Sequence, residues 1–193
     1  GHVVIAGVGT KGAQLAKSFL ASGRRVVLVD PATDSPAVHA LQAEGALSVH
    51  GDASHAEVLQ QARVGYAQHL VCVGGADELN VAAALHARKL AIAAGRRPAA
   101  PLLCHVHVFD PELRALLDTE PQPETGSQLR VFDGYAIAAR KFAAEHPLDT
   151  GLTGADDPRS VHLVVVGLGR LGSSLMMHAI RTAHFASLRP VKV

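Results

Sequence analysis

The sequence predicts an α/β protein with a Rossmann-like, doubly wound parallel sheet, followed by the start of a second Rossmann-like unit. Short runs of apolar residues recur along the chain without alternating polar positions, as in parallel strands that helices cover on both faces. Segments with the three- and four-residue spacing of an apolar helix face lie between these runs. A glycine-rich turn follows the first apolar run, and a second such turn follows another run late in the chain.

The strands are expected at the apolar runs, each of which has the length of an ordinary strand. Six of them belong to the sheet of the first unit, and a seventh opens the second unit. In chain order they are residues 2–6, 26–29, 46–49, 70–73, 102–109, 129–132 and 161–166.

The helices are expected between the strands, and several of them have recognisable end signals. Ser54 stands where an N-cap is expected, and Pro111 stands in the first turn of a helix. Gly45 and Gly95 end two others. The predicted helices are residues 11–21, 36–44, 54–61, 77–94, 111–117 and 135–146.

The composition narrows the class of protein. Apolar residues make up 48% of the chain and charged residues 18%, which is typical of a globular chain and not of a disordered one. The net charge of +1 produces no field that attracts nucleic acid, so no nucleic-acid partner is expected. Cys72 and Cys104 lie inside apolar runs and are expected to be buried free thiols. No apolar stretch approaches the roughly 20 residues of a membrane span.

Gly7, Gly9 and Gly12 follow the first strand with the spacing of a dinucleotide-binding turn. The first glycine permits the tight turn, the second lets the backbone approach a pyrophosphate, and the third lets the helix pack closely on the strand. The helix N-terminus presents N–H groups to the phosphates. Asp30 ends the second strand, 18 positions after Gly12. A carboxylate there accepts hydrogen bonds from a ribose diol and repels a 2′-phosphate, which favours NAD or an adenine nucleotide over NADP.

Gly167, Gly169 and Gly172 repeat this pattern after the late apolar run. The same step of 18 residues from Gly172 reaches Pro190, so no acid stands at the equivalent position. Nucleotide binding at the second turn therefore stays open, because duplicated units often keep the fold and lose the ligand.

The two glycine turns suggest how the chain is divided. Residues 1–146 are expected to form one nucleotide-binding Rossmann domain. Residues 147–160, which contain prolines and glycines, are expected to be a linker. Residues 161–193 are expected to begin a second Rossmann-like nucleotide-binding unit that is incomplete in this sequence.

No catalytic or metal-binding residue is predicted. His105 and His107 alternate along one strand and share a face, but no third ligand has a suitable spacing, so packed or surface histidines are favoured. The motifs of serine hydrolases and zinc proteases are not found. Tyr135 is followed by Ala139 where a short-chain dehydrogenase would have its lysine. An NAD-dependent oxidoreductase with its catalytic part outside this sequence stays open as the alternative.

The stretches GVGTKG, LVD, VHGDAS and VGGADELNVAAALHARKL resemble, in this order, the nucleotide-binding half of RCK domains, the regulators of potassium conductance. These are also called TrkA-N or potassium-transport NAD-binding domains, and the resemblance covers about residues 2–108. The later stretch LRVFDGYAIAARKFAAEHPLD, with GLGRLG after it, is similar to tandem RCK proteins. The resemblance implies a cytoplasmic regulatory module of a membrane potassium channel or transporter, peripheral to the inner face of the plasma membrane through that partner.

The resemblance also implies a ligand and a way of assembly. The expected cofactor is NAD(H), with ADP or AMP as alternatives, and the helix 135–146 is expected to pair two copies into a homo-oligomer. Asp52 as a turn residue, Asp77 as an N-cap and Lys11 as a solvated side chain are the alternatives to ligand contact. The expected cofactor-binding residues are Gly7, Val8, Gly9, Thr10, Lys11, Gly12, Asp30, Pro31, Asp52, Ala53, Val73, Gly74, Asp77, Asn80, Gly167, Gly169, Arg170 and Gly172.

Overall fold

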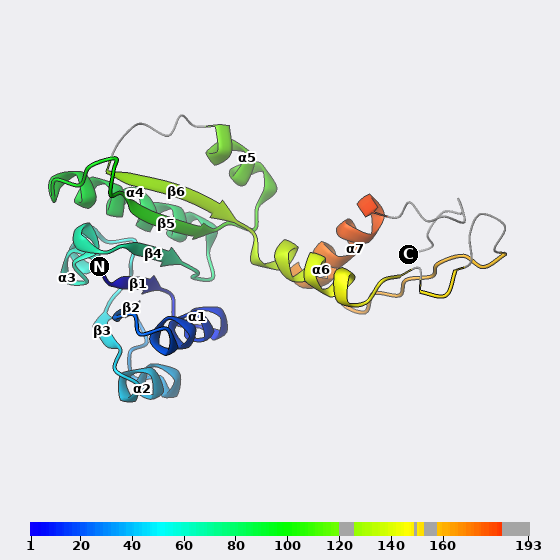
Figure 1. The fold of residues 1–193 in the computed structure, drawn as a ribbon, viewed down its shortest axis with the longest axis horizontal. Helices are drawn as coiled ribbons and strands as arrows, with labels where there is room; N and C mark the ends of the chain where they lie inside the picture. Colours follow the sequence, from blue (N-terminus) through cyan, green and yellow to red (C-terminus); the bar gives the residue numbers. More distant parts are fainter. Residues whose placement is uncertain (120–125, 149, 153–157, 183–193) are drawn as a thin grey trace. The chain divides into compact units, whose positions relative to one another are not determined.

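The computed structural model describes residues 1–119, 126–148, 150–152 and 158–182. The chain divides into two compact units, Gly1–Phe132 and Asp133–Val193. The first contains a sheet with helices on both faces, and the described residues of the second contain two helices (Figure 1).

The sheet of the first unit has six strands, all parallel, in the order β3-β2-β1-β4-β5-β6. The chain begins in the middle of the sheet, builds one half outward, crosses over and builds the other half. This is the doubly wound order of a Rossmann fold and confirms the predicted fold class. The strands are β1 (Val3–Ala6), β2 (Val26–Asp30), β3 (Leu47–His50), β4 (His69–Cys72), β5 (Leu102–His107) and β6 (Ser127–Phe132).

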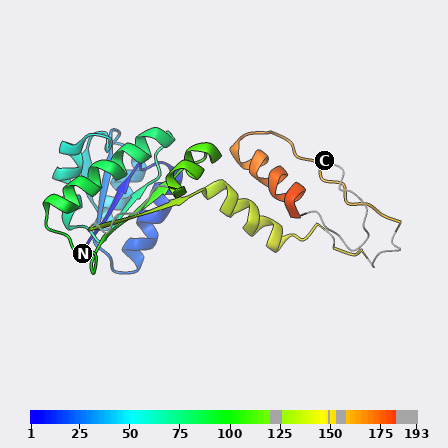
Figure 2. The same ribbon diagram turned by 90° about the horizontal axis from the view of Figure 1, so that it is seen from above.

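Two hydrophobic cores lie on the two faces of the sheet. In β1, Val3 and Ile5 pack with the helices α1 (Thr10–Ala21) and α2 (Pro36–Ala43), whereas Val4 packs into the core that contains α4 (Asp77–Ala93). Figures 1 and 2 show α1 and α4 on opposite faces. Burial on both faces explains why the central strands β1 and β2 are continuous apolar runs. The helices of this unit are α1 (Thr10–Ala21), α2 (Pro36–Ala43), α3 (Ala56–Gln61), the 3₁₀ turn η1 (Val64–Tyr66), α4 (Asp77–Ala93) and α5 (Pro111–Thr119).

The predicted strands and helices of this unit lie within two residues of the observed ones. One end signal was wrong: α3 has its N-cap at His55 without a side-chain cap bond, not at Ser54. The backbone N–H of Ser54 instead donates to Asp52 Oδ1 at 2.8 Å, which closes a local turn before the helix.

The two cysteines are buried free thiols, as predicted. They lie on the neighbouring strands β4 and β5 and belong to the same core. Burial raises the pKa of Cys104 to about 12 and raises the pKa of Cys72 well above its ordinary value. Both thiols therefore stay protonated and act as small apolar side chains.

The second unit contains α6 (Gly134–Glu145) and α7 (Arg170–Thr182), which pack against each other. Asp133 caps α6, because its Oδ1 accepts hydrogen bonds from the backbone N–H groups of Tyr135 and Ala136. The strand predicted at 161–166 is not observed: only an isolated bridge occurs at His162, and Val166 is 95% exposed. A strand is held by its neighbours, and the described residues of this unit contain no other strand to pair with it.

Parts of the predicted linker and of the second unit lie outside the described residues, as does Pro190. The division into domains therefore stays a prediction. Among the helices of the described ranges, none combines the length and the apolar character that a membrane crossing requires.

Candidate functional site

The first glycine turn joins β1 to α1 with a geometry that its glycines make possible. Gly7 has φ +93°, and a Cβ there would lie 2.7 Å from the backbone nitrogen of Gly74. A Cβ on Gly12 would lie only 1.9 Å from the carbonyl oxygen of Gly7. At Gly9, in contrast, a Cβ would meet no heavy atom of the described structure within 4 Å. Two glycines therefore close the turn, and Gly9 leaves open space beside the backbone.

The helix that follows begins directly at this open space. Gly9 is the N-cap of α1, and its carbonyl accepts the hydrogen bond of the Ala13 N–H at 2.9 Å. Thr10, which is exposed, and Lys11 form the first turn of the helix. The backbone N–H groups of a first turn have no acceptor inside their helix, and they favour an anion in front of it.

Asp30, at the end of β2, holds the glycine turn in place. Its Oδ2 accepts a hydrogen bond from the Val8 N–H at 2.6 Å, and its Oδ1 accepts one from the Ala32 N–H at 2.8 Å. Pro31, which follows Asp30 in the sequence, is exposed. The carboxylate is half-buried, and two carboxylate oxygens offer about four acceptor positions. The carboxylate retains capacity for a ligand hydroxyl beside its two backbone bonds.

Asp52 and Ala53 follow β3, the strand next to β2. The Gly51 N–H donates to the carbonyl of Asp30 at 3.2 Å, which brings the two strand ends together. The hydrogen bonds from Ser54 lower the pKa of Asp52, so this carboxyl is ionised at neutral pH. Ala53 packs against the core. The structure shows the turn role of Asp52, which is compatible with ligand contact.

Asn80 fastens the ends of β4 and β5 to each other. Its side chain is 3% exposed, and its Oδ1 accepts from the Gly74 N–H at 2.9 Å. Its Nδ2 donates to the carbonyl oxygens of Gly74 at 3.1 Å and His107 at 3.0 Å. Val73, the residue before Gly74, is buried and faces Gly12. Asn80 thus fixes the backbone beside the glycine turn, at Gly74 and at the end of β5.

Asp77 lies in the first turn of α4 and does not cap that helix, while its contact with a ligand stays a prediction. The N-cap of α4 is Ala76, so the N-cap interpretation of Asp77 was wrong. Its Oδ2 instead accepts hydrogen bonds from the N–H groups of Phe109 and Asp110, both at 2.8 Å. Its Oδ1 is buried without a hydrogen-bond partner within the described part of the chain. Asp77 ties α4 to the loop after β5.

Lys11 crosses from α1 to the end of β5. Its Nζ lies 3.3 Å from Nε2 of His107, which is completely buried. The His107 ring contacts Phe132 edge-on, with ring centroids 5.5 Å apart. The two partners are 96 residues apart in sequence, and no sequence signal identified the contact.

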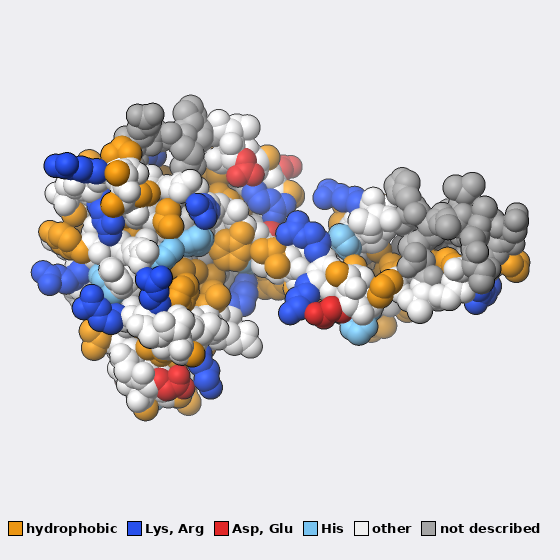
Figure 3. Space-filling model, viewed as in Figure 1, with side chains coloured by type: hydrophobic (Ala, Val, Ile, Leu, Met, Phe, Trp, Pro, Cys, Tyr) orange, Lys and Arg blue, Asp and Glu red, His pale blue; other side chains and the backbone are white. Residues whose placement is uncertain are grey.

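His105 lies on the same face of β5 as His107, but its partner is His69 and not Lys11. Its Nε2 lies 3.3 Å from Nδ1 of His69 on β4, and the rings stack. Burial lowers the pKa of both, helped for His69 by Arg24 and for His105 by His69. Figure 3 shows histidine and hydrophobic side chains side by side on the visible face of this unit. No group of three or more potential metal ligands occurs among the residues that the structure describes.

The second glycine turn, in the other unit, has the same backbone geometry as the first. Gly167 has φ +92°, and a Cβ on Gly172 would lie 2.0 Å from the Gly167 carbonyl oxygen. Gly169 again has open space, and its carbonyl accepts the Ser173 N–H at 2.9 Å. The pattern read from the sequence is therefore a real structural repeat.

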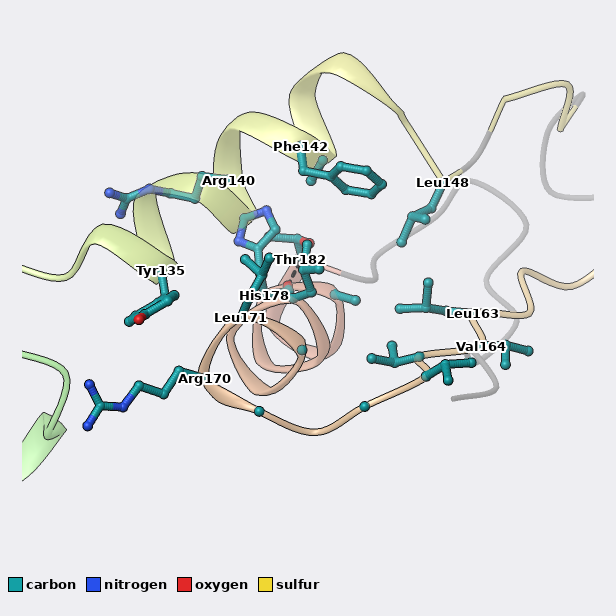
Figure 4. A pocket seen from close by; sticks show the side chains of 18 of the residues that line it. Tyr135, Arg140, Phe142, Leu148, Leu163, Val164, Arg170, Leu171, His178 and Thr182 are labelled. Carbon is teal, nitrogen blue, oxygen red and sulfur yellow. Dashed lines mark hydrogen bonds between the residues drawn. The ribbon is translucent and has the colours of Figure 1, made fainter. Parts of the chain in front are cut away.

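A cavity of about 960 Å³ adjoins this second turn, within the second unit. It is lined by α6, α7 and the segment between Leu163 and Gly172. Figure 4 shows Arg170 and Tyr135 on one side of it and the apolar Leu163 and Leu148 on the other. The turn thus opens beside a cavity with both cationic and apolar walls.

The strand order, the glycine turn after β1 and the acid at the end of β2 together define a nucleotide-binding domain of the Rossmann type. Residues 3–97 match the family model of the TrkA-N domain. This part of the chain belongs to the TrkA-N family, as the motifs in its sequence indicated.

Solved structures share the fold. The GsuK channel is 21% identical, with a TM-score of 0.67 over 99% of this chain and 42% of that chain. GsuK bound to ADP is 23% identical, with a TM-score of 0.63 over 94% and 41%. The TrkA-N domain of the inner membrane protein ybaL from Escherichia coli is 23% identical, with a TM-score of 0.54 over 75% and 96%. The chain thus spans about two fifths of these two GsuK chains.

Proposed function

We propose that the first unit binds NAD(H), or ADP or AMP, at the glycine turn and acts as a cytoplasmic regulatory module of a membrane potassium channel or transporter. The observation that carries this proposal is the Gly7–Gly12 turn held by the Asp30 carboxylate, with Gly9 open to a ligand. Family membership supports it, as do the structures of GsuK with NAD and with ADP.

Each group of residues around the first glycine turn has a role in this proposal. The first turn of α1 binds the phosphates, with Thr10 and Lys11 beside them. Asp30 accepts hydrogen bonds from the ribose, with Pro31 next to it, and Asp52 and Ala53 border the adenine. The remaining contacts come from the ends of β1 and β4 and the start of α4, at Val8, Val73, Gly74, Asp77 and Asn80.

The Asp30 carboxylate gives the proposal its test. An ionised carboxylate repels the 2′-phosphate of NADP(H), so NAD(H), ADP and AMP should bind more tightly than NADP(H). Calorimetric titration measures this, and equal or tighter NADP(H) binding overturns the assignment. Asp30→Ala should weaken the preference, whereas Asp34→Asn, which changes an exposed carboxylate in the same loop, should leave it intact.

The regulatory role is distinguished from oxidoreductase chemistry by turnover. A regulatory ligand acts through its different affinities for two states of the protein and is not consumed. With NADH or NAD and a panel of aldehydes and alcohols, the absorbance of NADH should stay at background. Sustained turnover that Gly9→Trp abolishes would favour the oxidoreductase instead.

The proposal extends to the second unit in two ways. The matching geometry of Gly167, Gly169 and Gly172 supports a second nucleotide site in which Arg170 contacts phosphate. The half-exposed Ile137 and Phe142 on α6 support pairing of two copies through this helix. In this view the nucleotide biases how paired units are arranged.

A further inference from the structure

The side chain of Lys11 is half-buried, and its ammonium group lies at the end of the sheet. Lys11 belongs to the first turn of α1, the turn at which the proposed nucleotide places its phosphates. Its Nζ lies 3.3 Å from Nε2 of His107, at the end of β5. The Lys11 ammonium is therefore held beside the glycine turn by His107, a residue from another part of the sheet.

The chemistry of the contact fixes the state of the histidine. An ammonium group only donates hydrogen bonds, so Nε2 of His107 is the acceptor and the imidazole is neutral. The ring has no exposed surface and rests edge-on against Phe132, while the His107 backbone carbonyl is bound by Asn80. Because its ring and its backbone are both fixed, His107 is a rigid holder for a flexible lysine.

The two glycine turns of the chain differ in where they place a cation. The first turn reads GVGTKG and the second GLGRLG. Arg170 of the second turn occupies the position of Thr10, and Leu171 occupies the position of Lys11. The cation of the first turn thus stands one residue later in the sequence. It is a compact ammonium group on a flexible stem and not a planar guanidinium, so its orientation depends on a partner.

We propose that Lys11 and His107 together read the phosphate charge of the bound nucleotide, with His107 as the positioning residue. The ammonium has three donors, so it keeps one on Nε2 and directs others to phosphate oxygens. Holding the lysine in advance reduces the side-chain freedom that is lost when the ligand binds. This inference rests on the proposed nucleotide binding and adds a determinant of ligand preference to it.

The test is a titration of the whole chain with adenosine, AMP and ADP, which share the nucleoside and differ in the number of phosphate groups. Lys11→Met should weaken ADP binding about 10-fold or more, the size expected for one charge-assisted hydrogen bond, and leave adenosine binding unchanged. Lys17→Met is the matched control, because Lys17 lies on the same helix and pairs with Glu44. This control should bind all three ligands as the parent does.

His107→Phe removes the acceptor and keeps a ring against Phe132. It should weaken ADP binding about 3- to 10-fold, with no further loss when it is added to Lys11→Met. His107→Gln, which restores an acceptor, should recover part of the loss. An unchanged ADP-to-adenosine ratio in Lys11→Met, or equal losses for adenosine and ADP, overturns the inference while nucleotide binding stands. Failure of the parent chain to bind any adenine nucleotide overturns the proposed function itself.

Discussion

Replacing Gly9 with alanine separates the folding of the glycine turn from its use. Among the described residues, no heavy atom lies within 4 Å of a Cβ built at this position. The backbone there, with φ −67° and ψ −172°, is accessible to any residue. The added methyl group therefore meets no steric clash until a phosphate approaches the backbone. Gly12→Ala is the opposite case, because its Cβ would lie 1.9 Å from the Gly7 carbonyl oxygen.

The expected magnitudes differ accordingly. At Gly9, alanine reduces the conformational freedom of the unfolded chain, which stabilises the folded state by about 0.4–1 kcal/mol. Alanine is also a poorer N-cap than glycine, which destabilises the helix by about as much, so the free energy of unfolding should change by less than about 0.5 kcal/mol. That corresponds to a shift in Tm of about 1–2 °C. If the methyl group removes one backbone hydrogen bond to a phosphate, binding weakens by about 1.5–3 kcal/mol, or about 10- to 100-fold. Gly12→Ala should lower both stability and affinity, although alanine is the better helix former by about 1 kcal/mol.

Differential scanning fluorimetry and calorimetric titration with ADP measure the two quantities on the same samples. Gly169→Ala is the matched control, because it adds a methyl group to the equally open position of the second turn. It should leave ADP binding at the first turn unchanged. If Gly9→Ala binds ADP as tightly as the parent chain does, the first turn is not where the phosphates bind.

Three further outcomes are expected. Asn80→Ala leaves three backbone groups without their partner and should lower the free energy of unfolding by about 2–4 kcal/mol in urea; a loss below about 0.5 kcal/mol contradicts this. The lowered pKa values of His69 and His105 mean that the folded state disfavours their charged forms. Stability should then be complete above the unfolded pKa of about 6.5 and fall with decreasing pH below it. The midpoint of urea unfolding, measured between pH 7.5 and 5.5, should depend less on pH in His105→Gln than in the parent chain. His39→Gln, which changes an exposed histidine, should leave the pH dependence unchanged. In light scattering, the chain should be a dimer that Phe142→Glu makes monomeric at unchanged Tm, and a monomeric parent chain excludes pairing through α6.

The parts of the fold that follow from local chemistry could be predicted from the sequence. The central strands β1 and β2 are largely buried on both faces and are therefore apolar runs, and shorter apolar runs were enough to locate the more exposed edge strands β3 and β6. The geometry of the first turn follows from its glycines, because the positive φ of Gly7 and the close approach at Gly12 leave no room for another residue.

The side-chain contacts across the sheet could not be predicted in this way. Lys11 and His107 meet because the parallel sheet brings the end of β5 within reach of the first turn of α1, although the two residues are 96 positions apart, and the meeting depends on sheet register and on the rotamer of a long side chain. For the same reason Asp77, which has the residue type of an N-cap, binds backbone N–H groups of a distant loop.

The run at 161–166 shows what apolarity does and does not determine. Its sequence is as apolar as that of β1, and Val164 and Val166 are nevertheless strongly exposed. An apolar run indicates a segment suited to burial, whereas a strand also needs a neighbour that supplies its hydrogen bonds. The prediction was wrong at this point because it treated a requirement of the whole sheet as a property of the segment.

The same distinction explains why a glycine pattern alone is weak support for nucleotide binding. The two turns of this chain have nearly identical φ at Gly7 and Gly167, so the backbone of the turn is determined locally. Their surroundings differ: a Cβ at Gly7 would strike Gly74 at the end of β4, while one at Gly167 would meet nothing within 4 Å in the described structure. Asp30 also reaches the first turn from a neighbouring strand, through the N–H of the residue after Gly7. Preference among nucleotides therefore depends on the strand ends around a turn, and these surround the first turn in the structure described.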